Sequence, residues 1–456
     1  MLSINNIIIF LVVVYIIVQY QKKQLNNVCV ALMVAYVCLP VIKFSGERGI
    51  NSAYIVTLVI CVLFGIQLIK KNIIFDKIST LYLAAMLLST GSVMVGWLVN
   101  GNPKASDIIN FTGIGQYILG TYLFSRLIAI FNLKKDEVMV KGIKWILGLN
   151  IIASIVEIAS WKIGNLFIRQ FYAYTGKEGP INVEATRAGF VRVFGTFYSP
   201  SVLGVMSLLI STYILFTTIE KNKIILEYVV LYCCAVALGL LAFSKLAIIG
   251  TPLVMGISIV YITIQKRKIK VLKLMLKMCA IMLLSYIIVV SLQWCLGYHG
   301  PVKYYYRTAF NISKAMESRY ANIDEPSSAE SSNDASNKKT SNDDEKEGIV
   351  SSATQIFKEH PIIGVGPAPI KNEFLGDSEY IGVLHNGGLT NFAIHLILYS
   401  VLGIYWMCQK GNRELFTLLA IGISGVSVMV FSYGCVIPFL ASCIIKNEEN
   451  VAKQNL

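Results

Sequence analysis

Apolar residues run through this chain in unbroken stretches separated by short polar connections. Most stretches approach the roughly 17 to 25 residues that a helix needs to cross the hydrocarbon core of a bilayer. They cover residues 4–20, 28–44, 52–69, 78–99, 108–131, 145–164, 201–219, 224–243, 246–264, 278–296, 385–408 and 415–445. The last stretch is too long for one straight helix, so we expect a broken span or a span followed by a re-entrant piece. The pattern predicts an all-α polytopic integral membrane protein with about twelve transmembrane helices.

Composition agrees with this pattern. Only 14% of the 456 residues are charged, 55% are hydrophobic, and the mean hydropathy is +0.64. Soluble globular proteins carry roughly a quarter charged residues, so an ordinary soluble enzyme is excluded. Intrinsic disorder of the whole chain is excluded as well, because disorder requires low hydrophobicity and high charge. Nine of the ten cysteines lie within or beside apolar stretches, which indicates small buried side chains rather than a disulfide framework or a thiolate metal site.

The formal net charge of +14 is distributed in small basic groups at the ends of apolar stretches. These groups follow the odd-numbered predicted spans, as the positive-inside rule requires of a protein that crosses the membrane many times. Nucleic-acid binding would need one contiguous basic face, and none is visible in the sequence. We therefore place the basic connections, among them 134–144 and 266–277, in the cytoplasm. The N-terminus and two long connections then lie on the outer side, and the first stretch is expected to be a retained span rather than a signal peptide.

This topology divides the chain into five parts. Residues 1–164 form N-terminal transmembrane helices, 165–200 a first extracytoplasmic loop, 201–296 central transmembrane helices, 297–384 a large extracytoplasmic loop and 385–456 the C-terminal transmembrane helices. Within the large loop, 304–320 has the spacing of an amphipathic interfacial helix. The tract 325–347 is rich in Ser, Asn, Asp and Lys, cannot bury a core and should be mobile.

The junction between the large loop and the next span carries the first candidate for chemistry. His385 is followed by Asn386 and two glycines, which allow a ligand to approach the backbone closely. A histidine can act as a general base near neutral pH, although an interfacial histidine at a helix start explains the position equally well. His395 lies deeper in the same stretch, where a hydrogen bond between helices is the favoured interpretation.

A second segment of the large loop, 360–367, is rich in residues that shape the backbone. His360 precedes a proline and is expected to contribute to the turn there. Gly364 and Gly366 indicate a backbone that must turn or approach something closely.

Four basic residues on the predicted outer side are not required by the topology. Arg187 and Arg192 precede a span, Lys245 lies in a very short connection, and Arg319 closes the amphipathic segment. An anionic ligand at the outer face would need such side chains, and arginine suits phosphate best because its planar fork donates two parallel hydrogen bonds. Contact with lipid head groups explains any one of them, whereas four in connections that could converge favour a ligand. No His, Asp or Glu cluster has metal-ligand spacing, so we expect neither a metal nor another cofactor.

These segments resemble the Wzy/O-antigen ligase superfamily of membrane glycosyltransferases. The resemblance is carried by FKEHPIIGVGPAPI and LHNGGL within 356–389, by RVFGTFYSPSVLG before a span, by AFSKLAI and by ESRY. The family's Ser-Arg turn is Ser244-Lys245 here, which keeps the charge but loses the bidentate geometry of arginine. The tract at 325–347 also separates Arg319 from its usual companion helix.

The resemblance implies a GT-C-like membrane glycosyltransferase that works at the outer face of the cytoplasmic membrane of a bacterium. Its donor would be an oligosaccharide linked to polyprenyl diphosphate, and neither metal nor nucleotide sugar would be needed. The leading hypothesis is a Wzy-type O-antigen or capsular polysaccharide polymerase that moves a growing glycan onto a lipid-linked repeat unit. In this hypothesis His385 and Arg319 are catalytic. The substrate is bound by Arg187, Arg192, Lys245, Asn386, His360, Gly364 and Gly366.

Three other functions remain open. A ligase would transfer finished glycan to another carrier, and these short motifs do not separate it from a polymerase. A flippase for lipid-linked oligosaccharide would be a transporter, and the HPIIGVGP and HNGG segments argue against it. A structural scaffold for glycan assembly would lose nothing when the outer arginines are replaced. The expected partners are the polyprenyl-linked oligosaccharide, membrane lipids, and a flippase and chain-length regulator of the same pathway, with no nucleic acid.

Overall fold

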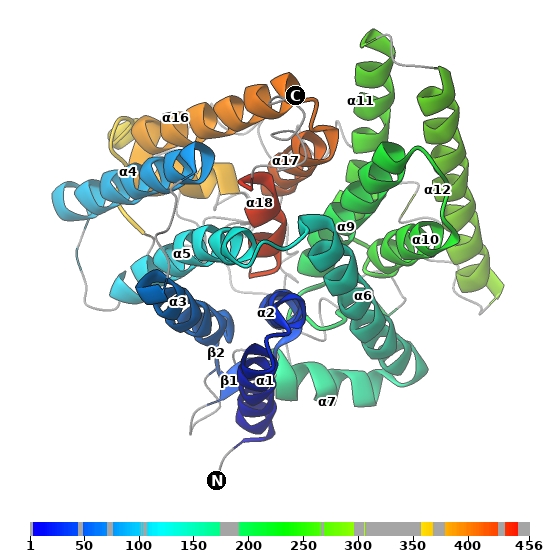
Figure 1. Ribbon diagram of the computed structural model, residues 1–456, viewed down its shortest axis with the longest axis horizontal. Helices are drawn as coiled ribbons and strands as arrows, with labels where there is room; N and C mark the ends of the chain where they lie inside the picture. Colours follow the sequence, from blue (N-terminus) through cyan, green and yellow to red (C-terminus); the bar gives the residue numbers. More distant parts are fainter. Residues whose placement is uncertain are drawn as a thin grey trace, which may run out of the picture.

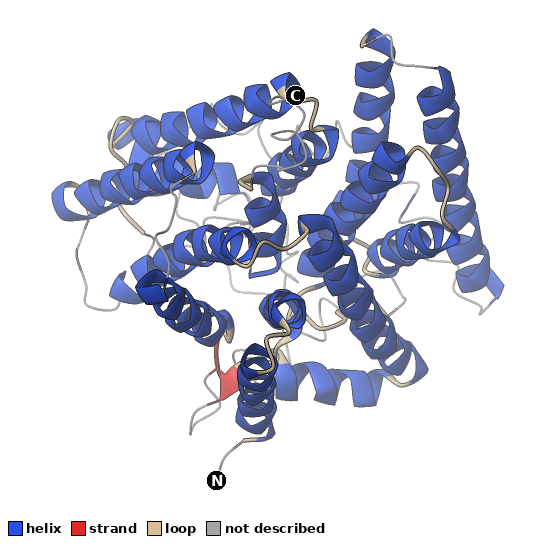
Figure 2. Cartoon of the chain, viewed as in Figure 1, coloured by secondary structure: helices blue, strands red, loops and turns tan. Residues whose placement is uncertain are grey.

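The structure is a computed structural model, and its helices account for nearly all of the described chain (Figures 1 and 2). It describes residues 3–43, 49–70, 76–101, 103, 107–173, 191–265, 269–295, 305, 357–367, 379–426 and 434–445. Arg187, Arg319, the predicted interfacial helix at 304–320 apart from Tyr305, and the tract at 325–347 lie outside these residues.

Within the described ranges, the elements follow one another as helices, with a short hairpin between α2 and α3. They are α1 (Ile4–Gln21), α2 (Leu25–Cys38), β1 (Ile42–Lys43), β2 (Gly49–Ile50), α3 (Ala53–Lys70), α4 (Lys77–Val99), α5 (Ile108–Ile130), α6 (Lys135–Ala159), α7 (Trp161–Phe171), α9 (Pro200–Lys221), α10 (Leu226–Leu241), the π-helical turn η2 (Leu246–Gly250), α11 (Thr251–Ile264), α12 (Ile269–Cys295), α16 (Glu379–Cys408), α17 (Asn412–Gly425), the 3-10 turn η5 (Gly434–Val436) and α18 (Ile437–Cys443). The strands pair antiparallel, with Ile42 opposite Ile50.

Seven described helices are long and apolar enough to cross a membrane, and they confirm a polytopic membrane protein. They are Ile4–Gln21, Lys77–Val99, Lys135–Ala159, Pro200–Lys221, Leu246–Ile264, Ile269–Cys295 and Glu379–Cys408. Shorter apolar helices cover other predicted spans, and the long stretch 415–445 is divided between α17 and α18. The total number of crossings therefore stays a prediction.

Several predicted boundaries are wrong for identifiable reasons. Helix α2 ends at Cys38 rather than near 44, because Pro40 lacks an N–H and disfavours helix before it. The predicted span 145–164 breaks at Ser160, whose extended backbone separates α6 from the amphipathic α7. The basic stretches 134–144 and 266–277 are not entirely loops, since α6 begins at Lys135 and α12 at Ile269. Lysines at the start of these helices extend them beyond their apolar parts.

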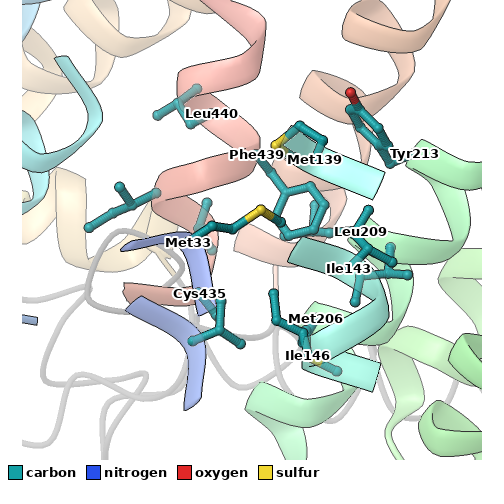
Figure 3. Packing of buried hydrophobic residues seen from close by; sticks show 14 of the residues in the cluster. Met33, Met139, Ile143, Ile146, Met206, Leu209, Tyr213, Cys435, Phe439 and Leu440 are labelled. Atoms are coloured by element: carbon teal, nitrogen blue, oxygen red, sulfur yellow. The ribbon is translucent and has the colours of Figure 1, made fainter. Parts of the chain in front are cut away.

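Helix α9 forms the centre of the bundle and is buried along nearly its whole length. It begins with Ser199 as N-cap and Pro200 in its first turn, a favoured arrangement for helix initiation. Figure 3 shows how segments far apart in sequence meet beside it: Met33 of α2, Met139 of α6 and Phe439 of α18. This shared core fixes α18 against the N-terminal helices.

A partly buried charge cluster joins the ends of α6, α9 and α17. It consists of Lys135, Asp136, Glu220, Arg413 and Glu414. Lys135 Nζ lies 2.5 Å from Glu414 Oε1. Arg413 Nη1 lies 2.8 Å from Asp136 Oδ2 and 3.2 Å from Glu220 Oε2. Because a buried charge needs a charged partner, these five side chains define how the three helix ends meet.

Candidate active site

Helix α16 is interrupted where the sequence reads His-Asn-Gly-Gly. Gly388 has φ +63° and ψ −161°, so the chain leaves the helical conformation there and resumes it at the next residue. Such a φ is common only for glycine. The break separates a short half-helix that carries His385 and Asn386 from the longer half that continues to Cys408. Each half therefore has ends that need hydrogen-bond partners from elsewhere.

Residues 361–366, which we name the strap, supply these partners. The N–H groups of Val365 and Gly366 donate to the carbonyls of His385 and Asn386, at 2.9 and 2.8 Å. On the other side of the break, the N–H groups of Leu389 and Thr390 donate to strap carbonyls at 361 and 362, at 2.8 and 3.1 Å. The strap thus replaces the helical hydrogen bonds that the break removes.

The close approach of the strap depends on glycines. A Cβ at Gly364 would lie 2.3 Å from the His385 carbonyl oxygen, and one at Gly388 would lie 2.5 Å from the carbonyl carbon of Ile362. Gly366 has φ +85°, and a Cβ there would lie 2.4 Å from Trp97 Cβ. The prediction that Gly364 and Gly366 allow close approach is confirmed, and the partners are the backbone of α16 and residue Trp97 of α4. Contact of these glycines with a substrate stays a prediction.

Helix α4 covers the strap from the other side. Asn100 Nδ2 donates to the carbonyl oxygens of Ile363 and Gly364, at 3.2 and 2.9 Å. A Cβ at Gly96 would lie 2.9 Å from the Ile363 oxygen, so a larger residue would push the strap away. Sequence reasoning missed Gly96 and Asn100, although a glycine and an asparagine near the end of an apolar helix were the available signal.

His385 lies inside this arrangement and is only 1% exposed. Its Nδ1 is 3.0 Å from Asn386 Oδ1. With the amide oxygen as acceptor, the neutral imidazole carries its proton on Nδ1, and Nε2 holds the lone pair that a base uses. Asn386 therefore acts on the tautomer of His385, and its contact with a substrate stays a prediction.

A chain of buried side-chain hydrogen bonds crosses the break on the α4 side. The Ser89 hydroxyl donates to Asn391 Oδ1 at 2.6 Å and lies 3.0 Å from His395 Nε2. Asn391 Nδ2 then donates to the Val383 carbonyl at 3.2 Å. Since Ser89 uses its proton on Asn391, its oxygen accepts from His395. The structural role expected for His395 is confirmed, and the chain connects the long half of α16 to the half-helix with His385.

The basic residues form a second group at the end of α10. Arg192 Nε donates to the Ala242 carbonyl at 3.1 Å, and the N–H of Val193 donates to Leu241 at 3.2 Å. Lys245 follows three residues after Ala242 and its side chain is exposed. Arg192 and Lys245 thus both lie near the end of α10, and their shared contact with an anionic ligand stays a prediction.

Two polar residues of α6 hold the segment after Arg192. Glu157 Oε2 accepts from the Phe194 N–H at 2.6 Å, and Asn150 Oδ1 accepts from the Thr196 N–H at 2.9 Å. Gly195 between them has φ +62°. Glu157 is fully buried, so this intramembrane carboxyl group has a positioning role that the sequence pattern alone did not reveal.

The predicted site residues therefore divide into two described groups. His385, Asn386, Gly364 and Gly366 lie at the break of α16, and the half-buried His360 directly precedes the strap. Arg192 and Lys245 lie at α10, which Figure 1 draws on the other side of the bundle from α4 and α16. Among the described residues, no group of three or more His, Cys, Asp or Glu side chains could hold a metal ion.

Comparison with known proteins tests the resemblance. No curated protein matches the chain. A family model described as O-Antigen ligase, Wzy_C, matches residues 228–393. The match includes Lys245, the strap, His385 and Asn391, whereas Arg192 precedes it. The resemblance expected from the short motifs is confirmed over this segment. Residues 228–393 are therefore similar to the Wzy_C O-antigen ligase family domain.

Proposed function

We propose that this protein is a polysaccharide polymerase of about twelve spans with a GT-C-like arrangement. It transfers a growing glycan from polyprenyl diphosphate onto a lipid-linked repeat unit at the outer face of the cytoplasmic membrane. The observation that carries the proposal is the break of α16, where buried His385 has its Nδ1 3.0 Å from Asn386 Oδ1. A base held in one tautomer by protein contacts suits proton abstraction.

The reaction joins an acceptor hydroxyl to the anomeric carbon of the donor. His385 Nε2 takes the hydroxyl proton while the oxygen forms the new glycosidic bond. The bond from the anomeric carbon to the diphosphate breaks, and diphosphate leaves with its polyprenyl chain. Arg187, Arg192, Lys245 and Arg319 neutralise the charge of the diphosphate. Neither a metal nor a nucleotide sugar takes part in this proposal.

One transfer requires the two groups of residues to face the same substrate. Arg192 and Lys245 lie at α10, and His385 lies at α16. Arg187 and Arg319 lie outside the described residues, in the predicted loops that supply the remaining basic contacts. In the proposal, bound lipid diphosphate brings the basic group and the base to one centre.

A ligase is the second candidate, because the matching family model carries that description. The size of lipid-linked glycan in a deletion strain separates the two. Single repeat units on the outer leaflet support a polymerase, whereas long lipid-linked chains support a ligase. Normal glycan in every respect would contradict both and leave the scaffold or another function.

The base assignment is tested by His385→Ala with His360→Ala as the matched control. Loss of a general base costs about 100-fold to 10,000-fold in rate, so His385→Ala should reduce polymer to trace amounts at normal protein level. His360→Ala removes a nearby histidine that lacks this tautomer control, and we expect a much smaller loss. Unchanged polymer length and yield in His385→Ala would eliminate His385 as the base.

A further inference from the structure

The turn that carries Lys245 connects the end of α10 to the π-helical turn η2. Within 242–248, Lys245 is the only exposed residue. Phe243 is fully buried and has φ +51°, a conformation that a bulky side chain rarely adopts without support from its surroundings. Ser244 packs against Gly204 of α9, where a Cβ would collide with it. The buried residues therefore fix the turn, and Lys245 alone is presented at the surface.

Both predicted outer loops bind the end of α10 just before this turn. Tyr305 Oη, from the large loop, donates to the Leu240 carbonyl at 3.0 Å. The next two carbonyls of the chain accept hydrogen bonds from the first loop, through the N–H of Val193 and Nε of Arg192. The last carbonyls of a helix lack partners within it, so residues of the two loops complete the hydrogen bonding at this helix end.

Tyr305 also supports the unusual backbone conformation in the turn. Its ring stacks on that of Phe243, with the ring centroids 5.3 Å apart and the planes at 6°. Its Oη lies 3.3 Å from Oε1 of Gln293, a buried residue of α12. The ring therefore holds Phe243 while the hydroxyl group lies between the end of α10 and α12.

A second tyrosine holds the chain on the other side of Lys245. Tyr286 Oη donates to the carbonyls of Ala247 and Ile248 in η2, at 3.1 and 3.0 Å. Tyr286 and Gln293 are two helical turns apart and lie on one face of α12, which packs against α10 (Figure 1). π-Helical turns are rare and occur frequently at functional sites. One face of α12 thus contributes to the contacts on both sides of the lysine.

We propose that Tyr286 and Tyr305 are positioning residues for Lys245 in glycan transfer. Their hydroxyl groups hold the backbone before and after this lysine, so the turn is already ordered when the donor binds. Because Tyr305 belongs to the large loop and Arg192 docks on the same helix end, the contacts of the two outer loops meet at this turn. The inference rests on the proposed function, in which Lys245 contacts the donor diphosphate, and adds the residues that hold Lys245 in place.

Amide hydrogen exchange of the full chain in lipid nanodiscs tests whether the tyrosines hold the turn. Tyr286→Phe and Tyr305→Phe each remove one hydroxyl group and keep the ring. We expect exchange within 243–250 to become about threefold to tenfold faster, the range for one lost hydrogen bond. Tyr228→Phe is the matched control, because its hydroxyl accepts from Lys221 at the opposite end of α10, and it should leave this exchange unchanged. Wild-type exchange within 243–250 in both variants would overturn the proposal.

Binding of polyprenyl diphosphate without sugar gives a readout that a purely structural role would not produce. Each tyrosine variant should raise its Kd by about threefold to tenfold. Combined with Lys245→Met, neither variant should raise Kd beyond the value for Lys245→Met alone, since both act through the lysine. Increases that add to that of Lys245→Met would contradict the proposal. An unchanged Kd in Lys245→Met itself would remove the diphosphate contact from the proposed function, whereas faster exchange within 243–250 would still show that the tyrosines hold the turn.

Discussion

The two ends of α16 are held in opposite ways. At the Glu379 end, backbone groups of the strap pair with backbone groups on both sides of the Gly388 break. At the Cys408 end, Trp406 Nε1 donates to the Cys443 carbonyl at 2.7 Å beside the charge cluster, whose contacts are ion pairs between side chains. The Glu379 end depends on glycines that leave room for close backbone contact, and the Cys408 end lies beside side chains that are held by their charges.

This difference shows what each end tolerates. Backbone hydrogen bonds do not depend on side-chain identity, so the strap is sensitive mainly to added bulk at its glycines. A buried ion pair is sensitive to the loss of one partner, which leaves the other charge unpaired. The end proposed for catalysis can therefore vary its surface side chains, while the opposite end cannot exchange its charges singly.

The largest loss of stability is expected at the charge cluster. Glu414→Leu leaves Lys135 and Arg413 buried without their shared carboxylate, and breaking such a pair costs about 3–5 kcal/mol. Lys144→Met is the control, because the Lys144–Glu227 pair is about half exposed, and should cost no more than about 1 kcal/mol. Unfolding by denaturant in detergent measures both. Equal losses would show that burial of the Lys135–Glu414 pair is unimportant.

The same pair should make stability depend on acid. Burial alone would raise the pKa of Glu414, but Lys135 and Arg413 hold it at about 2. An unfolded glutamate titrates near about 4.3. The contribution of the Glu414 carboxylate to the free energy of unfolding is therefore fully present above its pKa in the unfolded state. It is lost as the pH falls through its pKa in the folded state. The loss of stability between these pH values should be smaller in Glu414→Gln than in the wild type, and an identical acid profile would contradict the assignment.

Next in size is the glycine at the helix break. Gly388→Ala forces an alanine into φ +63° and brings its Cβ within 2.5 Å of the strap. A residue in a sparsely populated conformation costs about 1–3 kcal/mol. We expect glycan transfer to fall more than stability, since the strap and His385 move together. Gly115→Ala, where nothing lies within 4 Å of the Cβ position, should be neutral or slightly stabilising.

The hydrogen-bond chain across the break should give an intermediate effect. Ser89→Ala removes the group that joins His395 to Asn391, and unsatisfied buried polar atoms cost about 1–3 kcal/mol. Glycan yield should fall with it, because Asn391 supports the half-helix of His385. Ser89→Thr keeps the hydroxyl and should restore most of the yield. A threonine variant as inactive as the alanine variant would argue that volume, rather than the hydroxyl, matters at this position.

The smallest change in stability, with a clear change in activity, is expected at Lys245. Its side chain is exposed, so Lys245→Met should alter stability by no more than about 0.5 kcal/mol. Transfer should fall if the ammonium neutralises diphosphate. Lys245→Arg restores the charge and adds a bidentate fork, and should keep or raise activity. Wild-type activity in Lys245→Met would remove this residue from the diphosphate site.

The sequence predicts the helical stretches and the glycine-rich segments well, because both depend on local physical preferences. Span length follows from the thickness of the bilayer, and Gly364 and Gly366 indicate close approach whatever the partner is. The partner itself was beyond prediction. No local feature of the segment HPIIGVG shows that its backbone supplies the hydrogen bonds missing from α16, a helix that begins later in the chain.

The parts that sequence reasoning missed depend on tertiary contacts. In the sequence, Glu157 resembles an isolated carboxyl group within a membrane span. In the fold, its Oε2 accepts a hydrogen bond from the Phe194 N–H. Arg413 belongs to a basic connection in sequence, yet it is buried among three carboxylates in the fold. Helix α7 was hidden because Trp161 and Ile163 extend an apolar stretch past Ser160. In each case the deciding partner is distant in the chain.

The strap also has a consequence for how the protein enters the membrane. Four backbone hydrogen bonds around the break are made by residues 361–366, so α16 cannot complete its own bonding inside hydrocarbon, where unpaired amide groups cost several kcal/mol. The strap precedes α16 in the chain and is synthesised first. Insertion of α16 is therefore finished by a segment already made, and the proposed catalytic histidine reaches its final environment only when the strap joins the two halves of this helix.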